Sequence, residues 1–234
     1  MNIIAFGDIH GEYYKLKRLV EKIHISADDT LVFLGDYIDR GRHSFEVINY
    51  LIELGKQYDC VFLRGNHELM FMDYMSGINE DMFIWNGGVK TIDSYAQHGY
   101  DSARHNDYTE RYIPKEHMEF FQNLKPYYET EGFVFVHAGV WPNTPLENLP
   151  DEILYWDRSY IYGSHADDYK GKVIVCGHTP SQDIMNEKHR ICIDTGACFE
   201  RMGKLTCVKL PEREFTQQGF VLEDLIDEKD SSSG

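Results

Sequence analysis

The sequence predicts an α/β fold built on parallel strands, and two observations lead to this expectation. Three short apolar runs, at residues 2–6, 31–34 and 60–63, alternate with two segments whose apolar residues recur at helical spacing. Polar side chains gather just after each run. This β-α-β-α-β order favours parallel strands joined by right-handed helical crossovers, with ligands bound beyond the carboxyl ends of the strands.

The two crossover helices are expected over residues 12–23 and in the segment that Gly55 closes. Their apolar residues recur three and four positions apart: Leu16, Leu19, Val20 and Ile23 in the first, and Phe45, Ile48, Leu51 and Ile52 in the second. A turn at Asp28 and Asp29 separates the first helix from the second strand. Each helix therefore has one apolar face to place against the sheet.

Residues 68–125 follow a different pattern, which predicts a helical insertion beside the strand ends. The segment is rich in aromatic residues and is interrupted at Gly87 and Gly88. Most of its aromatic side chains are expected to form the core of the insertion. Residues 100–110 are polar and are expected to form a loop.

Four further strands are expected, at residues 133–136, 173–176, 191–193 and 204–210. Between the first two, residues 141–151 form a proline-rich loop, and the strand at 204–210 closes a single domain over residues 1–210. The remainder, 211–234, is expected to be a C-terminal extension in which 220–226 dock as one short element and 227–234 are disordered.

Composition narrows the class of protein. The chain has 234 residues, 42% of them hydrophobic, and a formal net charge of −16, which argues against a nucleic-acid binder or a protein that binds anionic membranes. Its five cysteines are scattered without a CxxC pair, and no apolar run approaches 20 residues. No signal peptide is recognisable, so a cytoplasmic location is expected.

Metal-ligating residue types recur at the strand ends. The residues concerned are Asp8, His10, Asp36, Asn66, His67, His137 and His178. A single Gly-Asp after a strand is most often a turn, but recurrence after several strands favours a ligand site. These carboxylate, imidazole and amide side chains, with no thiolate among them, suit Mn²⁺, Fe or Zn²⁺. A catalytic zinc ion has about three protein ligands, so this larger set matches two ions that share a bridging carboxylate.

Five motifs occur in a fixed order: GDIHG (7–11), GDYIDRG (35–41), GNHE (65–68), HAG (137–139) and GHTP (177–180). With Trp156-Asp-Arg158 and Ile193-Asp-Thr-Gly-Ala197, they make the chain resemble the calcineurin-like metallophosphoesterases. Within that family it is most similar to serine/threonine protein phosphatases of the small bacterial and phage branch. The resemblance spans roughly residues 2–210 and implies a four-layer αββα sandwich with the helical insertion beside the active site.

The resemblance also implies a role for each motif residue. Asp8 and His10 would bind one metal ion, Asp36 would bridge two, and Asn66, His137 and His178 would bind the other. His67 would be the general acid, held by Asp39. Arg40 and Arg158 would bind the phosphate oxygens, together with Asn66. The two ions would be divalent, with Mn²⁺ expected and Fe or Zn²⁺ as alternatives, and a hydroxide that bridges them would attack phosphorus directly.

Physical chemistry agrees with most of these roles. The planar guanidinium of arginine matches phosphate oxygens, and a carboxylate bonded to histidine fixes the ring tautomer. Two residues keep alternative interpretations. Arg158 could form a surface salt bridge, because its Trp-Asp-Arg match is short. Glu68 is interpreted as a residue at the start of a helix that holds the metal ligands in position and is not itself a ligand.

Three functions are open at this point. The first is a metal-dependent phosphatase that hydrolyses phosphoserine, phosphothreonine or phosphotyrosine in proteins. Its substrate could also be a phosphorylated small molecule. The second is a symmetrical diadenosine tetraphosphate hydrolase, since that family carries nearly the same motifs, including the HAG and GHTP versions. The third is an inactive phospho-binding module, which the presence of every expected ligand disfavours.

Overall fold

The computed structural model describes residues 2–100, 112–159, 169–199 and 202–223. Most of the loop expected at 100–110, residues 160–168 between two of the expected strands, and the expected disordered tail lie outside these residues. Within the described ranges, no helix is both long and apolar enough to cross a membrane.

The first sheet contains the three parallel strands that the sequence predicts. Its strand order is β10-β9-β1-β2-β3, with β1, β2 and β3 parallel and the two C-terminal strands antiparallel. The strands are β1 (Ile3–Phe6), β2 (Thr30–Phe33), β3 (Asp59–Phe62), β9 (Leu205–Leu210) and β10 (Glu214–Gln218). Helices α1 (Tyr13–Lys22) and α2 (Ser44–Gln57) are the crossovers.

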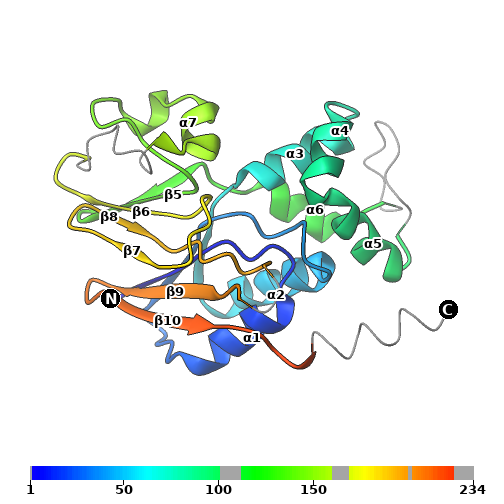
Figure 1. Ribbon diagram of the computed structural model, residues 1–234, viewed down its shortest axis with the longest axis horizontal. Coiled ribbons are helices and arrows are strands. Elements are labelled where there is room, and N and C mark those ends of the chain that lie inside the picture. Colours follow the sequence, from blue (N-terminus) through cyan, green and yellow to red (C-terminus); the bar gives the residue numbers. More distant parts are fainter. Residues whose placement is uncertain (1, 101–111, 160–168, 200–201, 224–234) are drawn as a thin grey trace.

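The second sheet has the order β4-β5-β6-β8-β7, with β5, β6 and β8 parallel. Its strands are β4 (Tyr127–Glu129), β5 (Phe133–Val136), β6 (Val173–Cys176), β7 (Met185–Asn186) and β8 (Arg190–Cys192). The short helices η2 (Leu146–Asn148) and α7 (Asp151–Trp156) lie between β5 and β6 in the chain. The parallel strands of both sheets deliver their carboxyl ends to one side of the molecule (Figure 1).

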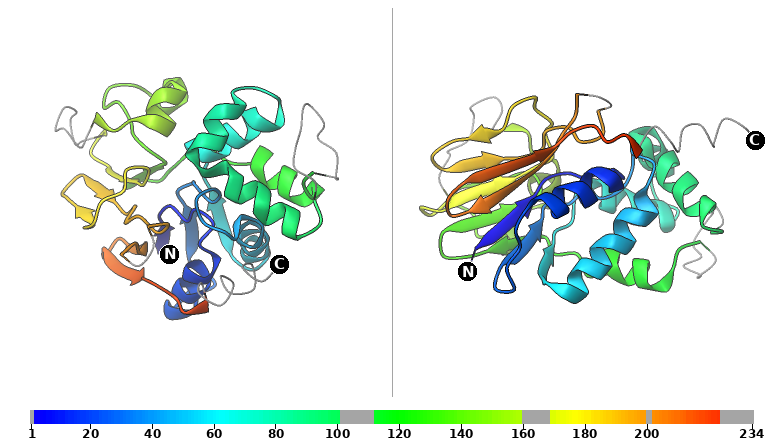
Figure 2. Two further views of the ribbon diagram at one scale, coloured as in Figure 1. Left: turned by 45° about the vertical axis from the view of Figure 1, so that its right-hand side comes forward. Right: turned by 90° about the horizontal axis from the view of Figure 1, so that it is seen from below.

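The two sheets pack face to face, and helices cover their outer faces (Figures 1 and 2). The inner layer is apolar and draws on both sheets, with Val32 and Val208 from the first and Phe135 and Val175 from the second. The first sheet packs its other face on α1 and α2, and the second packs its other face around α7. This arrangement confirms the expected four-layer sandwich.

The segment expected as an insertion is helical. It comprises α3 (Asn66–Met75), α4 (Glu80–Phe83), the π-helical turn η1 (Ile84–Gly88), α5 (Val89–Gln97) and α6 (Lys115–Gln122). Most of its aromatic side chains are buried, as expected, among them Phe71, Phe83 and Phe121. Trp85 is the departure, because 82% of its surface is exposed.

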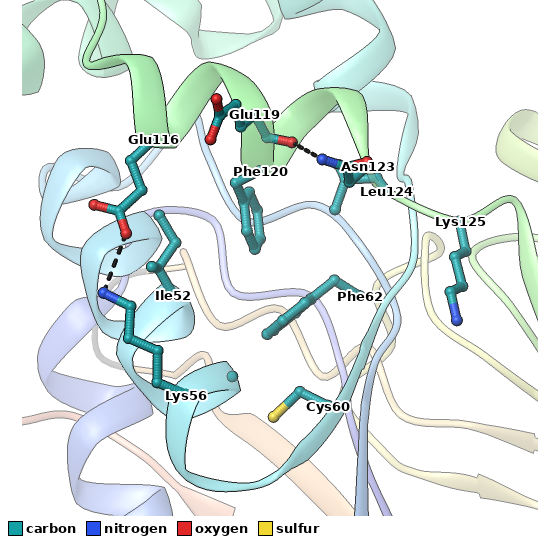
Figure 3. Close-up of a pocket in the computed structure, with 11 residues that line it drawn as sticks. Ile52, Lys56, Cys60, Phe62, Glu116, Glu119, Phe120, Asn123, Leu124 and Lys125 are labelled. Carbon is teal, nitrogen blue, oxygen red and sulfur yellow. Dashed lines mark hydrogen bonds and ion pairs between the residues drawn. The ribbon is translucent and has the colours of Figure 1, made fainter.

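A groove of about 350 Å³ lies where α6 passes over α2 and β3 (Figure 3). Phe62 and Phe120 form its apolar floor. At one end the Lys56 ammonium lies 3.1 Å from the Glu116 carboxylate. None of the site residues expected from the sequence lines this groove.

One expectation about the later part of the chain is wrong. The strand at 204–210 is not the last, because β10 pairs antiparallel with β9 and extends the first sheet at its edge. Its residues, Glu214 to Gln218, are mostly polar because an edge strand keeps much of its surface in water. The proline-rich loop expected at 141–151 is confirmed, apart from the short helix η2 and its last residue, Asp151, which begins α7.

His117 joins the insertion to the body of the protein. Its Nε2 donates to the Asn49 side-chain oxygen at 2.9 Å, and its Nδ1 accepts from the Tyr95 hydroxyl at 2.8 Å. Burial is the main cause that lowers the pKa of His117 from 6.5 to about 4. The neutral ring is therefore the form that fits this interface.

We expect the stability contributed by His117 to depend on pH. Because its folded pKa lies below its unfolded pKa, the contribution is complete above pH 6.5 and is lost as pH falls toward 4. The loss amounts to about 3 kcal/mol of unfolding free energy. Urea titrations of wild type and His117→Gln at pH 7.5 and pH 4 measure it: the gap between the two proteins should shrink at pH 4. A constant gap would contradict the prediction.

Candidate active site

The expected metal-site residues lie together at the carboxyl ends of strands from both sheets. Asp8 and His10 follow β1, Asp36 follows β2, His137 follows β5 and His178 follows β6. Asn66 and His67 open α3 just beyond β3. All of these side chains are buried. The structure thus places together the residues that the sequence pattern predicted to lie close to one another.

The loops that carry these side chains have unusual backbone angles. Positive φ angles occur at His10 (48°), Asp36 (53°), Asp39 (71°), Arg40 (67°) and His178 (67°). Non-glycine residues rarely adopt this left-handed conformation, and it persists where surrounding contacts enforce it. The occurrence of several such residues in these loops indicates that the contacts of their side chains outweigh the cost of the unfavourable backbone conformation.

Asp36 lies between two groups of imidazoles. Its Oδ2 is 3.5 Å from His10 Nε2, and its Oδ1 is 3.4 Å from His137 Nε2. Burial alone would raise the pKa of Asp36, but the imidazoles of His137 and His67 more than offset this and hold it well below its ordinary value. The carboxylate therefore stays ionised and presents one oxygen to each side.

On one side of Asp36, three ligand atoms converge. His137 Nε2 is 2.9 Å from the Asn66 side-chain oxygen and 3.2 Å from His178 Nδ1, and the latter is 3.0 Å from the same oxygen. The other ring nitrogen of His137 donates to the Leu34 carbonyl at 2.9 Å. A carbonyl only accepts, so the proton sits on Nδ1, and Nε2 presents a lone pair.

On the other side of Asp36, His10 is oriented in the same way. Its Nδ1 donates to the Ile38 carbonyl at 2.9 Å, which leaves the Nε2 lone pair facing the site. Asp8 accepts from the backbone N–H of His178 at 3.0 and 3.2 Å. Burial, with the neighbouring carboxylates of Asp194 and Asp36, raises the pKa of Asp8 well above its ordinary value.

In the part of the chain that the structure describes, two groups of side chains have the spacing needed to hold a metal ion. His10, Asp36 and His67 form one, and Asp36, His137 and His178 form the other, with the ligand atoms of each group within 4.8 Å of one another. Asp36 belongs to both groups, as a bridging ligand would. The first group contains His67 in place of the expected Asp8.

The chemistry of this donor set fits divalent cations. Lone pairs from His10 and His137 converge with the oxygens of Asp36 and Asn66, and His178 Nδ1 lies 3.0 Å from the Asn66 oxygen. Buried acceptors that face one another are costly unless a cation lies between them. Imidazole, carboxylate and amide ligands suit Mn²⁺, Fe and Zn²⁺ alike.

His67 and Asp39 form a buried pair beside this centre. His67 Nδ1 lies 2.6 Å from Asp39 Oδ2, and within the described residues its buried Nε2 has no hydrogen-bond partner. Burial tends to lower the pKa of His67, but the carboxylates of Asp36 and Asp39 reverse this and raise it. Thr91 donates to the second oxygen of Asp39 at 2.6 Å. The pair thus presents a ring nitrogen to the site.

The two arginines differ in how closely they approach the centre. Arg40 places Nη1 3.1 Å from His10 Nε2, and its backbone N–H donates to the Gly87 carbonyl in the insertion at 3.2 Å. Arg158 is exposed, and its charge contributes to lowering the pKa values of His137 and His178. Arg40 therefore contacts the centre directly, whereas Arg158 acts on it through its charge.

Glu68 supports the loop of Asp36, in the way that the sequence suggested for a residue that is not a ligand. One of its carboxylate oxygens accepts from the N–H groups of Asp36 and Gly65, each at 2.9 Å, and the other accepts from Tyr37 at 2.8 Å. The side chain is fully buried. Burial and the nearby Asp36 charge raise the pKa of Glu68 to about 7.

We expect Glu68→Gln to weaken metal binding. The amide replaces one acceptor oxygen with an NH₂ group that faces backbone N–H donors, so the loop of Asp36 loses its support. Loss of such supporting contacts typically lowers metal affinity by about 10- to 100-fold. Titration with Mn²⁺ followed by calorimetry measures this. The matched control is Glu53→Gln, an exposed carboxylate on α2, which should bind as the wild type does.

Two supporting residues were not identified from the sequence. Asp194 is buried, accepts from the Gly196 N–H at 2.9 Å, and has its pKa raised to about 6 by burial. It follows a strand as Asp8 does, so the same signal could have found it. Thr91 carried no signal, because the fold alone brings α5 to Asp39.

Comparison with known proteins shows the family to which the chain is related. A family model described as calcineurin-like phosphoesterase matches residues 1–192. The asymmetrical bis(5'-nucleosyl)-tetraphosphatase PrpE of Anoxybacillus flavithermus is 27% identical over 231 residues, covering 89% of this chain and 90% of that protein. The serine/threonine-protein phosphatase 2B catalytic subunit A2 of Saccharomyces cerevisiae is 41% identical over 87 residues, 36% of this chain and 14% of that protein.

Two solved structures share the fold. A putative diadenosine tetraphosphatase superposes with a TM-score of 0.67 at 19% identity and covers 94% of both chains. A cold-active protein tyrosine phosphatase gives a TM-score of 0.69 at 16% identity, covering 96% of this chain and 80% of that one. With the family model matching most of the sequence, the chain belongs to the calcineurin-like phosphoesterase family.

Proposed function

We propose that this protein is a dinuclear-metal-dependent phosphatase that hydrolyses phosphomonoesters on proteins. The observation that carries the proposal is the position of Asp36, with one carboxylate oxygen facing His10 and the other facing His137. Two divalent ions bound there would polarise the phosphoryl group and lower the pKa of water that attacks it. Mn²⁺ is the proposed metal, with Fe and Zn²⁺ as alternatives.

The residues around the centre would bind and orient the substrate. Arg40 places Nη1 3.1 Å from His10 Nε2, and the charge of Arg158 acts on His178; both guanidinium groups would bind phosphoryl oxygens. The side-chain amide of Asn66 could contribute a further contact from the start of α3. Asp8, His10, Asn66, His137 and His178 would complete the two metal sites around Asp36.

The pair of Asp39 and His67 supports a phosphomonoester substrate. An alkoxide that leaves from phosphoserine or phosphothreonine is a poor leaving group, so its oxygen needs a proton as the bond to phosphorus breaks. His67 Nε2 faces the site, and the hydrogen bond from Nδ1 to Asp39 favours the protonated ring. A phosphoanhydride releases a phosphate group, which leaves readily without that proton.

A second candidate function is hydrolysis of a dinucleoside tetraphosphate. It is favoured by relatives of nearly the same length, which bear the name asymmetrical bis(5'-nucleosyl)-tetraphosphatase. The motifs alone had suggested the symmetrical type. The products distinguish the two: diadenosine tetraphosphate gives ATP and AMP by asymmetrical cleavage and two molecules of ADP by symmetrical cleavage.

A substrate panel tests the proposal. Protein loaded separately with Mn²⁺, Fe²⁺ or Zn²⁺ is incubated with phosphoserine, phosphothreonine and phosphotyrosine peptides and, in parallel, with diadenosine tetraphosphate. We expect the highest kcat/KM for a phosphopeptide in the Mn²⁺ form and loss of activity with a chelator. A kcat/KM that is orders of magnitude higher for the dinucleotide would replace the first function with the second.

A further inference from the structure

Two cysteines of the second sheet lie directly side by side. Cys176 ends β6 and Cys192 ends β8, and they are register partners in this parallel pair of strands. Their Sγ atoms are 2.7 Å apart, and both residues are thiols. A disulfide requires about 2.05 Å between the sulfur atoms, so only a small movement separates the thiols from a bond.

Their surroundings keep the two sulfurs together. Both side chains belong to the apolar cluster between the second sheet and α7, which also contains Val134 and Leu154. Cys176 is completely buried, and 7% of the surface of Cys192 is exposed. Cys192 is thus the more exposed residue of the pair.

The pair lies immediately before the active site. Gly177 and His178 follow Cys176, and the Gly177 N–H donates to the His137 carbonyl at 2.9 Å. Asp194 follows Cys192 by two residues, and its backbone oxygen accepts from Ser181 at 3.1 Å. A bond between the cysteines would therefore tie together the ends of the two strands that carry His178 and Asp194.

We propose that Cys176 and Cys192 form an oxidisable dithiol, which a peroxide closes to a disulfide and which thereby controls the position of His178. The Cys192 sulfur attacks a peroxide oxygen, the O–O bond breaks, and a sulfenic acid and water form. The Cys176 sulfur then attacks the sulfenic sulfur, the S–O bond breaks, and a second water leaves with the remaining proton. The sum is two thiols and one hydrogen peroxide giving one disulfide and two waters.

The expected effect is a reversible loss of turnover. The two Sγ atoms must approach each other, and the ends of β6 and β8 are drawn together with them. Displacing a ligand in a catalytic centre by a fraction of an ångström disturbs its geometry, so turnover falls. Reduction by dithiothreitol returns the thiols and restores the original arrangement. This effect on turnover rests on the proposed phosphatase function, whereas formation of the crosslink does not.

The test uses the full-length, metal-loaded protein. It is treated with hydrogen peroxide at neutral pH, alkylated and digested without reduction, and the peptides are analysed by mass spectrometry. We expect a crosslinked peptide joining Cys176 and Cys192 that disappears after dithiothreitol treatment. In parallel, turnover of para-nitrophenyl phosphate should fall several-fold and recover on reduction.

Three variants keep the outcomes separate. Cys192→Ser and Cys176→Ala should each form no crosslink and retain turnover under peroxide. If one of these variants misfolds, the other still tests the proposal. Cys207→Ser changes a buried cysteine in the other sheet and should behave as the wild type. Absence of the crosslink would overturn the proposal, as would a crosslink that leaves turnover unchanged. An inactive protein that still forms the crosslink would instead count against the phosphatase function.

Discussion

Replacing Asp36 with asparagine is expected to lower turnover of a phosphomonoester by about 1000-fold and to reduce bound metal. The carboxylate faces His10 and His137 with separate oxygens, and an amide can offer only one of them as a ligand. The substitution suits the backbone, because asparagine tolerates the positive φ of 53° at this position. Metal content by plasma mass spectrometry and kcat with para-nitrophenyl phosphate are the measurements.

The control for Asp36→Asn is Asp59→Asn, which makes the same change at an exposed site on β3. That variant should keep its full metal content and turnover. Circular dichroism should report the same fold for both variants. If Asp36→Asn kept two ions per chain and wild-type turnover, the assignment of Asp36 as the bridging ligand would be wrong.

Replacing His67 with asparagine is expected to affect substrates according to their leaving groups. The asparagine amide can still donate to Asp39, but the variant has no titratable nitrogen to protonate a departing alkoxide. General acid catalysis typically contributes about 100- to 10,000-fold, so phosphoserine peptide and phenyl phosphate should lose about that much kcat. The activated ester para-nitrophenyl phosphate should lose far less.

The outcome for His67→Asn separates two roles of this residue. His67 also belongs to a group of side chains with metal-binding spacing. An equal loss of kcat for all leaving groups, together with a loss of metal, would make His67 a ligand and end its assignment as the acid. His24→Asn changes an exposed histidine outside every motif; it serves as the control and should leave all substrates unaffected.

The part of the fold that was predictable depends on strong local patterns. The buried strands, such as the one ending at Phe33, are continuous apolar runs, and their alternation with amphipathic helices fixes a parallel sheet. Strand ends in such a sheet meet at one edge, so the convergence of Asp8, Asp36 and His178 also followed from the sequence.

The rest depends on contacts between distant segments. β10 was missed because the edge strand from Glu214 to Gln218 is polar and resembles a loop in one dimension. Thr91 was missed because only the packing of α5 brings its hydroxyl to Asp39, 52 positions away in the chain. No local pattern encodes such a contact, since it arises when the insertion folds over the strand ends.

Gly87 and Thr91 of the insertion contact the loop that carries Asp39 and Arg40: the Gly87 carbonyl accepts from the Arg40 backbone N–H, and the Thr91 hydroxyl donates to Asp39. Gly87 has a φ of 101°, and a methyl group there would lie 2.9 Å from the Arg40 side chain. A chimera that imports this segment from a relative must therefore retain a glycine and a hydroxyl at those two points. Elsewhere, the water-facing surface of the insertion can vary in sequence. Selection for new substrates can therefore act on that surface without changing the residues of the active site.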